Sequence, residues 1–388
     1  MPYYESYRTR VPMREERGVS ALFEPLTLRS LTIPNRAWMA PMCQYSAAVE
    51  GPEQGVPTDW HLTHLGSRAV GGAGLIVVEA TAVSPEGRIS PADLGLWNER
   101  QQAQFGRITR FLTEHGAVPG IQLGHAGRKA STDRSWRGGA PVGPEQHGWQ
   151  PVAPSPIPFD EGHPVPEELS EADIRRVVED FAAAARRALA AGFTVVEIHG
   201  AHGYLIHEFL SPFSNRRTDA YGGSFANRAR FALEVVDAVR AEWPDELPLF
   251  FRVSATDWLS ENPEDPREGW TADDTVRLAK ELLAHGVDLL DVSTGGNAPK
   301  ARIPVEPGYQ VPFAARVKAE TDLPTSAVGL ITEPRQAEEI VASGQADAVM
   351  LGRELLRNPY WPNLAARELG SRGLGVPGRW PDQYHRAV

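Results

Sequence analysis

The chain has 388 residues, of which 41% are hydrophobic, and it carries a formal net charge of -11. This length and composition support a large core, within either one α/β barrel or two smaller domains. The negative charge disfavours nucleic acid and anionic membranes as partners, because the average field repels them. Cys43 is the only cysteine, which excludes an intrachain disulfide and a cysteine-ligated iron–sulfur or zinc centre.

Several features predict a cytoplasmic protein. Residues 1–20 are mostly polar and rich in Arg and Glu, so we expect a poorly ordered N-terminal extension and no signal peptide. No run of 18 apolar residues is present, so we expect no membrane span. A single cysteine suits a reducing compartment.

Short apolar runs alternate with helical patterns along the rest of the chain. After a plug or hairpin at 22–36, we expect strands at 37–42, 74–80, 117–123, from 195 onward, and at 249–253, 288–293, 324–328 and 346–351. Helices are expected near 60–71, 98–115, 170–192, 226–242, 333–343 and 359–369, with another that Thr271 and Asp274 begin. The clearest helix starts with the capping pair Ser170 and Asp173 and ends at Gly192.

The pattern of the strands predicts their arrangement. Strands that are apolar on both faces indicate a parallel sheet covered by helices, and eight successive βα units predict a (β/α)8 TIM barrel over residues 21–370. A Rossmann fold is disfavoured because no G-x-G-x-x-G motif follows the first strand. Residues 124–169 contain eight prolines, and we expect them to form a small capping subdomain after the third strand.

One stretch combines a strand with a cluster of polar groups. The apolar run from Val195 ends in a segment that places His199, His202 and Tyr204 within six positions. Such a cluster at a strand end can hold a polar atom and protonate its neighbour. Either His alone could instead satisfy a buried carbonyl. We expect no metal here, because no further His or carboxylate stands at a matching strand end.

The other strand ends suit an organic phosphate cofactor. Gly329 and Gly352 are either tight turns or a backbone cradle for phosphate, and Arg353 beside the second glycine favours phosphate. Gln122 can face the pyrimidine edge of an isoalloxazine ring. Arg252 can stabilise negative charge on that ring when it is reduced. A flavin lying over the barrel therefore fits the pattern.

Several motifs jointly identify a family. They are 40–46 (APMCQYS), 122–129 (QLGHAGRK), 199–205 (HGAHGYL), 214–219 (SNRRTD), 221–224 (YGGS), 227–231 (NRARF) and 352–353 (GR). Through them the chain, from about Leu22 to its C-terminus, resembles the Old Yellow Enzyme family of FMN-dependent ene-reductases, and within it the thermophilic-like subgroup.

The resemblance implies an NAD(P)H dehydrogenase that reduces the C=C bond of α,β-unsaturated carbonyl or nitro compounds, with NADPH or NADH as hydride donor. It implies that His199 and His202 bind the substrate oxygen and that Tyr204 protonates the α-carbon. Further substrate contacts would come from Tyr45 and Lys129. The FMN would lie against Pro41, Met42, Cys43, Ala80, Gln122, Arg252, Ser293, Gly329, Gly352 and Arg353, with Cys43 tuning its potential.

The resemblance also implies assembly into a homodimer or homotetramer. In this subgroup a C-terminal Arg enters the neighbouring protomer's site, and Arg386 within the tail 371–388 matches it, although the chain lacks the aromatic residue expected at its end. Related barrel flavoenzymes that act on dienoyl-CoA or amines carry an iron–sulfur cluster, which one cysteine cannot hold. A flavin redox sensor switched by Cys43 is the other alternative, and the full set of substrate-binding residues argues against it. Cys43 could also be a simple buried residue.

Overall fold

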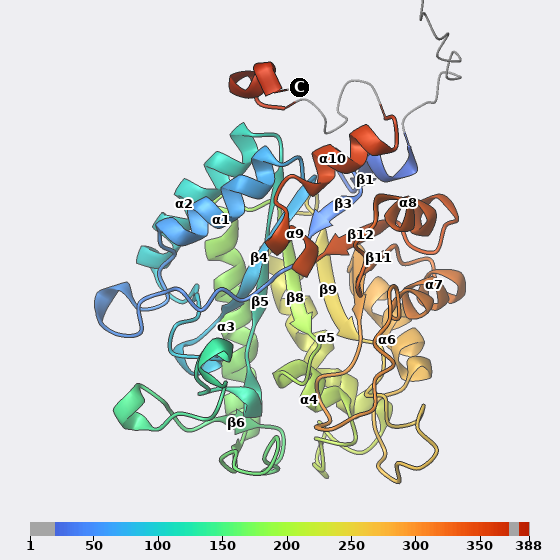
Figure 1. The fold of residues 1–388 in the computed structure, drawn as a ribbon. Helices are drawn as coiled ribbons and strands as arrows, with labels where there is room; N and C mark the ends of the chain where they lie inside the picture. The colour runs from blue at the N-terminus through green and yellow to red at the C-terminus, as the bar shows by residue number, and fades with distance from the viewer. Residues whose placement is uncertain (1–19, 372–379, 388) are drawn as a thin grey trace, which may run out of the picture.

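The core of the computed structural model, which describes residues 20–371 and 380–387, is a closed ring of parallel strands. In order around the ring these are β3 (Ala37–Met39), β4 (Leu75–Ala82), β5 (Val118–Gly124), β8 (Val195–Gly200), β9 (Leu249–Ser254), β10 (Leu289–Ser293), β11 (Thr325–Ala327) and β12 (Ala348–Leu351), as Figure 1 shows. The barrel confirms the fold predicted from the apolar runs. The extension predicted for residues 1–20 lies, except for Ser20, outside the described residues.

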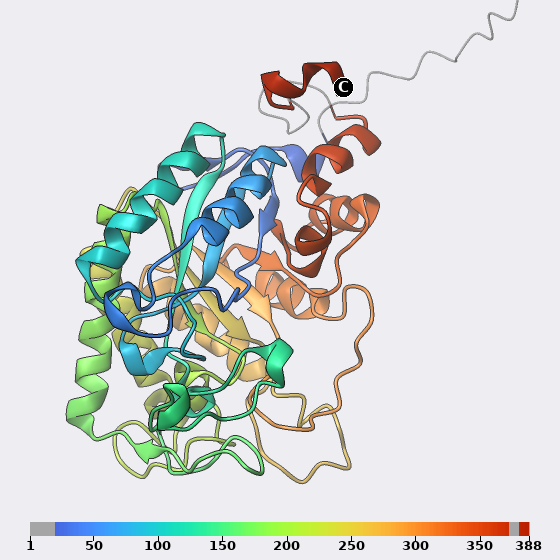
Figure 2. The ribbon, with the colours of Figure 1, turned by 60° about the vertical axis from the view of Figure 1, so that its left-hand side comes forward.

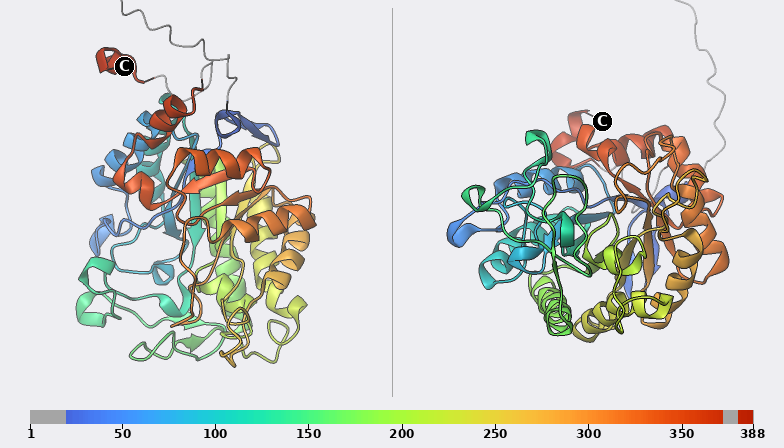
Figure 3. Two further views of the ribbon diagram at one scale, coloured as in Figure 1. Left: turned by 45° about the vertical axis from the view of Figure 1, so that its right-hand side comes forward. Right: turned by 90° about the horizontal axis from the view of Figure 1, so that it is seen from below.

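Helices surround this ring on its outer side (Figures 2 and 3). They are α1 (Asp59–Val70), α2 (Glu99–Glu114), α3 (Glu171–Ala190), α4 (Leu205–Leu210), α5 (Phe225–Glu242), α6 (Ala272–Ala284), α7 (Val311–Glu320), α8 (Pro334–Ala342), α9 (Arg353–Arg357) and α10 (Trp361–Glu368). The last predicted helix, near 359–369, corresponds to α10, and the short helix α9 before it was not predicted. The sequence patterns gave no bounds for α4 or α7.

Two predicted capping boxes begin long helices. At the start of α3, the Ser170 hydroxyl accepts from the Asp173 backbone N–H at 3.2 Å, and the Asp173 carboxylate accepts in return. Thr271 and Asp274 make the same reciprocal pair at the start of α6. Each box satisfies backbone donors that the first helical turn leaves without partners.

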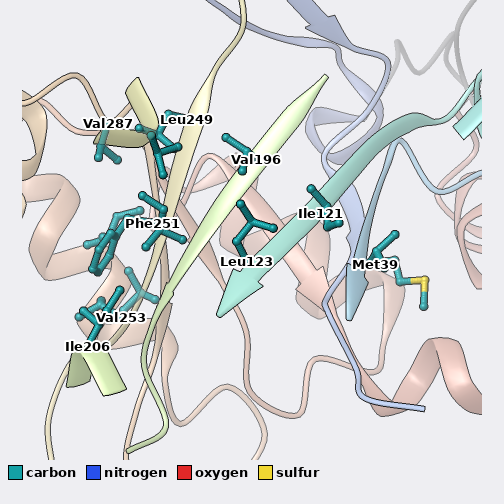
Figure 4. Packing of buried hydrophobic residues seen from close by; sticks show 14 of the residues in the cluster. Met39, Ile121, Leu123, Val196, Ile206, Leu249, Phe251, Val253 and Val287 are labelled. Carbon is teal, nitrogen blue, oxygen red and sulfur yellow. The ribbon is translucent and has the colours of Figure 1, made fainter. Parts of the chain in front are cut away.

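The strands separate two apolar layers. Residues that face outward pack under the helices, and Figure 4 shows Ile121, Leu123, Val196, Phe251 and Val253 among them. Residues that face inward at the amino ends of the strands form a second cluster around Trp38 and Phe250. The hairpin of β1 (Leu26–Leu28) and β2 (Leu31–Ile33), which follows η1 (Ala21–Phe23), contributes to this second cluster and closes that end of the barrel.

The two ends of the barrel carry different segments. Beyond the carboxyl ends of the strands lies the long connection after β5, with η4 (Gly127–Lys129), η5 (Ser135–Arg137), η6 (Pro144–Gln146) and the short pair β6 (Val152–Ala153) and β7 (Glu167–Glu168) (Figure 1). Smaller turns η2 (Gly51–Glu53) and η3 (Pro85–Gly87) precede it. The C-terminal turn η7 (Asp382–Ala387) lies at the opposite end. Among the described helices, none is long and apolar enough to cross a bilayer.

Candidate active site

Inside the barrel, side chains change from apolar to polar toward the carboxyl ends of the strands. Successive inward positions are Val195, Glu197 and His199 on β8, Phe250, Arg252 and Ser254 on β9, and Leu289, Asp291 and Ser293 on β10. In the register of these strands, Glu197 pairs with Phe250 and His199 with Arg252, whereas Arg252 pairs with Asp291 and Ser254 with Ser293. The reactive groups therefore stand on a polar layer, which itself rests on an apolar floor.

The polar layer is internally paired. Gln122 Nε2 donates to Glu197 Oε1 at 2.8 Å, and Arg252 Nε lies 2.9 Å from Asp291 Oδ2. Burial raises the pKa of Glu197 to about 8, with Asp291 acting in the same direction and Arg252 opposing both. One guanidinium thus faces two buried carboxyl groups, and burial raises the pKa of both.

His199 is held as a neutral hydrogen-bond donor. Its ring is 3% exposed, and burial lowers its pKa well below the usual range, with Arg252 acting in the same direction. The Ala201 backbone N–H donates to Nδ1 at 3.3 Å. Since Nδ1 accepts, the single proton of the neutral ring is on Nε2, which can donate to a ligand.

His202 lies next to His199 on a strained turn. Its φ is 60°, and the two imidazole rings meet edge to face with centroids 5.2 Å apart. The Ser254 hydroxyl accepts from the His202 backbone N–H at 2.9 Å, and Ser293 Oγ lies 2.8 Å from His202 Nε2. Burial also lowers the pKa of His202 well below its usual range. Both imidazoles are therefore neutral.

Tyr204 completes the predicted cluster. Its ring centroid lies 5.0 Å from that of His199, and it is the N-cap residue of α4. Burial raises the pKa of its phenol well above the usual range, and Cys43 and Asp93 act in the same direction. The phenol is accordingly a proton donor and not a phenolate at neutral pH. The structure thus brings together the three groups that the sequence placed within six positions.

Lys129 faces the same turn from the connection after β5. Its ammonium donates to the backbone carbonyls of His202 at 2.8 Å and of Gly296 at 2.9 Å. It also lies 5.2 Å from the centroid of the Tyr204 ring. Burial lowers the pKa of Lys129 to about 8. Lys129, which the sequence predicted to contact substrate, therefore also links the His202 turn to the loop that contains Gly296.

The segment after β3 carries the next predicted residues. Tyr45 has a φ of 48°, and its carbonyl accepts from Arg134 Nε at 3.0 Å, while Trp136 packs edge-on against its ring. Burial, followed by Asp93 and Glu79, raises the pKa of the Cys43 thiol well above its usual range. The thiol stays neutral, and Arg134 and Trp136 tie the long connection after β5 to the segment that follows β3.

Glu79 and Asp93 are buried acids that sequence reasoning missed. Glu79 Oε2 accepts from the Gln44 backbone N–H at 2.5 Å, and Asp93 Oδ1 accepts from the Ser90 hydroxyl at 2.7 Å. Burial raises the pKa of Asp93 to about 7. Glu79 could have been found from the sequence, because it is an acidic residue inside the apolar run at 74–80. The sequence around Asp93 has no comparable pattern that would have identified Asp93.

The segments that follow β11 and β12 form a part of the barrel opening that suits a phosphate group. A cavity of about 110 Å³ is lined by Gly329, Gly352, Arg353 and Arg357, among others. Gly329 has a φ of 120°, and an added Cβ would approach the side chain of Gln310 to 3.0 Å. Bare backbone and guanidinium groups form a donor set that fits a phosphate. Gln310 was not predicted; its Oε1 accepts from the Thr294 hydroxyl at 2.7 Å.

The remaining predicted residues lie in two places. Ala80 lines a small cavity with His199 and Tyr204, and Gly352 approaches Met42, whose sulfur would lie 3.7 Å from an added Cβ. Pro41 precedes Met42 at the same strand end. Arg386 is exposed and belongs to η7, the C-terminal turn at the end of the barrel opposite this site (Figure 1).

Comparison with known proteins agrees with this geometry. A family model described as "NADH:flavin oxidoreductase / NADH oxidase family" matches residues 21–371. An NADPH dehydrogenase of Geobacillus thermodenitrificans is 49% identical over 367 residues, which cover 95% of this chain and 98% of that protein. An NADH:flavin oxidoreductase of Gibberella zeae is 46% identical, with coverage of 95% and 91%.

Solved structures share the barrel. Morphinone reductase superposes with a TM-score of 0.74 at 29% identity, covering 95% of this chain and 98% of that one. An old yellow enzyme homologue from Zymomonas mobilis gives 0.71 at 26% identity, with coverage of 93% and 99%. A 2-naphthoyl-CoA reductase gives 0.78 at 27% identity, but the match covers only 52% of that longer chain.

A pair of glycine substitutions tests how tightly the His202 turn is packed. Gly203 and Gly223 have φ values of 72° and 80°, so Ala at either site incurs a similar backbone strain of about 1 kcal/mol. Only at Gly203 would the new Cβ collide with the carbonyl of Gly296. We expect Gly203→Ala to lower the urea midpoint clearly more than Gly223→Ala. Equal shifts would contradict the close contact.

Proposed function

Since the chain belongs to the NADH:flavin oxidoreductase / NADH oxidase family, which includes the Old Yellow Enzymes, we propose that it reduces the C=C bond of α,β-unsaturated carbonyl or nitro compounds. It is an FMN-dependent oxidoreductase with a nicotinamide as hydride donor. The proposed reduction of C=C bonds rests on one observation, which is that two neutral imidazoles lie beside a protonated phenol at one strand end. NADPH, which the names of the bacterial relatives specify, is the donor to test first.

The residues at the mouth of the barrel divide into those that hold FMN and those that meet the substrate. Gly329, Gly352 and Arg353 would hold its phosphate, and Gln122 and Arg252 would face its ring, with Pro41, Met42, Cys43, Ala80 and Ser293 as further contacts. When bound, FMN supplies the hydride for the β-carbon of the alkene.

The His pair polarises the alkene through its oxygen. His199 Nε2–H donates to the carbonyl or nitro oxygen, where negative charge grows as the β-carbon becomes reduced. His202 can donate as well when Nδ1 carries its proton and Nε2 accepts from the Ser293 hydroxyl, whose single proton then turns from Gln310 Oε1 to the imidazole. Both rings are neutral, so they stabilise the developing charge as fixed dipoles that need no reorganisation.

Tyr204 supplies the proton. Its phenol O–H transfers a proton to the α-carbon, and a new C–H bond forms as the O–H bond breaks. The Lys129 ammonium near the ring stabilises the phenolate until the proton returns from solvent. Tyr45 and the capping segment that holds it would bound the pocket and exclude water from the reacting carbon.

Removal of either imidazole tests the proposed function. NADPH-dependent turnover of cyclohexenone should fall about 10²–10³-fold in His199→Ala or His202→Ala, because each removes one donor from the developing oxyanion. FMN content, read from its visible absorbance, should stay at the wild-type level. The control is His285→Ala, which removes a partly exposed imidazole paired with Asp237 and should leave the rate unchanged. Wild-type turnover in both site variants, or no turnover by the native enzyme, would refute the proposal.

The pH dependence separates neutral from charged donors. Burial lowers the pKa values of His199 and His202 well below the usual range, so both stay neutral across the pH range in which an ordinary His loses its charge, near pH 6.5. Turnover of cyclohexenone should therefore not decline as the pH rises from about 5.5 to about 7. NADPH-dependent ferricyanide reduction serves as the control for flavin reduction. A decline centred near pH 6.5 in the enone reaction alone would indicate an imidazolium donor instead.

The C-terminal tail is proposed to complete the site in a homodimer or homotetramer. Because η7, which contains Arg386, lies at the end of its own barrel opposite the site, Arg386 would meet a substrate in another protomer. We expect Arg386→Ala to raise the KM for cyclohexenone about tenfold, the effect of losing one charge-assisted hydrogen bond of roughly 1.5 kcal/mol. Gln383→Ala in the same turn is the control. An unchanged KM for Arg386→Ala would assign the tail a structural role only.

A further inference from the structure

The turn that carries His202 and Tyr204 is held against a neighbouring loop without a regular ladder of hydrogen bonds. His202 and Gly203 both have positive φ, at 60° and 72°. An added Cβ on Gly296 would lie 2.7 Å from His202 Cα, so the two loops touch backbone to backbone. A small displacement of this turn would move the Tyr204 phenol and the His202 ring together, which makes the contacts that fix its backbone important for the reaction.

His207 makes one of these contacts with the backbone of the turn. It lies on α4 with no exposed surface, and its Nδ1 accepts from the Gly203 backbone N–H at 3.0 Å. Its Nε2 lies 3.0 Å from Asp257 Oδ1. An imidazole nitrogen accepts only when it carries no proton, so Nδ1 must be bare and the proton must be on Nε2, facing Asp257.

The surroundings of Asp257 favour its ionised form. It is fully buried, and its Oδ2 accepts from the Ser211 hydroxyl at 2.5 Å, the Trp270 backbone N–H at 2.9 Å and Asn297 Nδ2 at 3.4 Å. Burial acts to raise its pKa, but His207, Ser211 and the Trp270 N–H together bring the pKa below the usual range. Oδ1 is thereby left to accept the proton-bearing nitrogen of His207.

We propose that the buried His207–Asp257 pair is a positioning device that fixes the tautomer of His207 and so anchors the Gly203 turn in the geometry that proton transfer from Tyr204 requires. Neither residue is placed in contact with substrate or FMN; both act through the backbone of Gly203. Replacement of Asp257 should allow the imidazole to adopt the wrong tautomer, with an N–H facing the Gly203 N–H. This inference rests on the proposed function, because it concerns the protonation step.

Two substitutions at His207 separate positioning from packing. The amide of Gln can accept from Gly203 with its oxygen and donate to Asp257 with its nitrogen, whereas Leu fills the space and can do neither. His285→Leu is the control, since it removes another His–Asp pair, that with Asp237, on the surface. FMN content and the urea midpoint are measured for each holoenzyme, so that loss of fold or cofactor is seen directly.

Two electron acceptors distinguish the protonation step from flavin reduction. With NADPH, cyclohexenone requires the Tyr204 proton, whereas ferricyanide takes electrons without it. We expect His207→Leu to lower kcat for cyclohexenone tenfold or more, about the cost of a misplaced reacting group, and to keep the ferricyanide rate. His207→Gln should recover kcat to within about threefold of wild type, since it restores both hydrogen bonds.

Several outcomes would overturn the inference. They are a wild-type cyclohexenone rate in FMN-loaded His207→Leu, equal losses in the Leu and Gln variants, or a parallel loss of the ferricyanide rate. If His207→Leu does not fold, Asp257→Asn carries the test, with the same selective loss expected and a wild-type rate contradicting it. If the native enzyme reduces ferricyanide but not cyclohexenone, the proposed function fails, and not the positioning role.

Discussion

The closed ring of parallel strands fixes the chemistry of this protein, because it sets the solvation of every group inside it. Along β8, β9 and β10 the interior passes from apolar side chains to a paired polar layer and then to the reactive groups. Burial at that level raises the pKa of acids such as Glu197 and lowers the pKa of His199 and His202. The site therefore contains neutral donors where an exposed cluster of the same residues would titrate near neutrality.

This solvation also explains why so many side chains around the site are held by backbone groups. A buried polar atom without a partner is costly, so the loops at the strand ends satisfy it locally. Ala201 donates to His199, Ser254 accepts from His202, and Lys129 bridges two carbonyls. These contacts satisfy the polar groups of the turn and keep its imidazoles and phenol in one arrangement.

The sequence predicted what depends on local pattern. Apolar runs gave the strands, capping boxes at Ser170 and Thr271 gave the starts of α3 and α6, and the residues after the fourth strand gave the reactive cluster. Contacts between distant segments could not be read in this way. Asp257 meets His207 across 50 positions, and the left-handed conformation of Tyr45 leaves no sign in a non-glycine residue.

The two ends of the barrel have separate roles in this account. The carboxyl end bears the proposed catalytic groups and the long connection after β5, as the barrel fold favours. The amino end is closed by the β1–β2 hairpin and bears the C-terminal turn. The 2-naphthoyl-CoA reductase, which is the longer chain, matches this protein over only 52% of its own length.

The central claim is that a neutral His pair binds the substrate oxygen directly over the flavin. Titration of the holoenzyme with a para-substituted phenol tests it most directly, because a phenolate oxygen takes the place of the substrate oxygen. The account predicts saturable binding with a long-wavelength charge-transfer band, and loss of both in His199→Ala and His202→Ala. A native enzyme without the band, or variants that bind the phenol as tightly as the native enzyme, would contradict it.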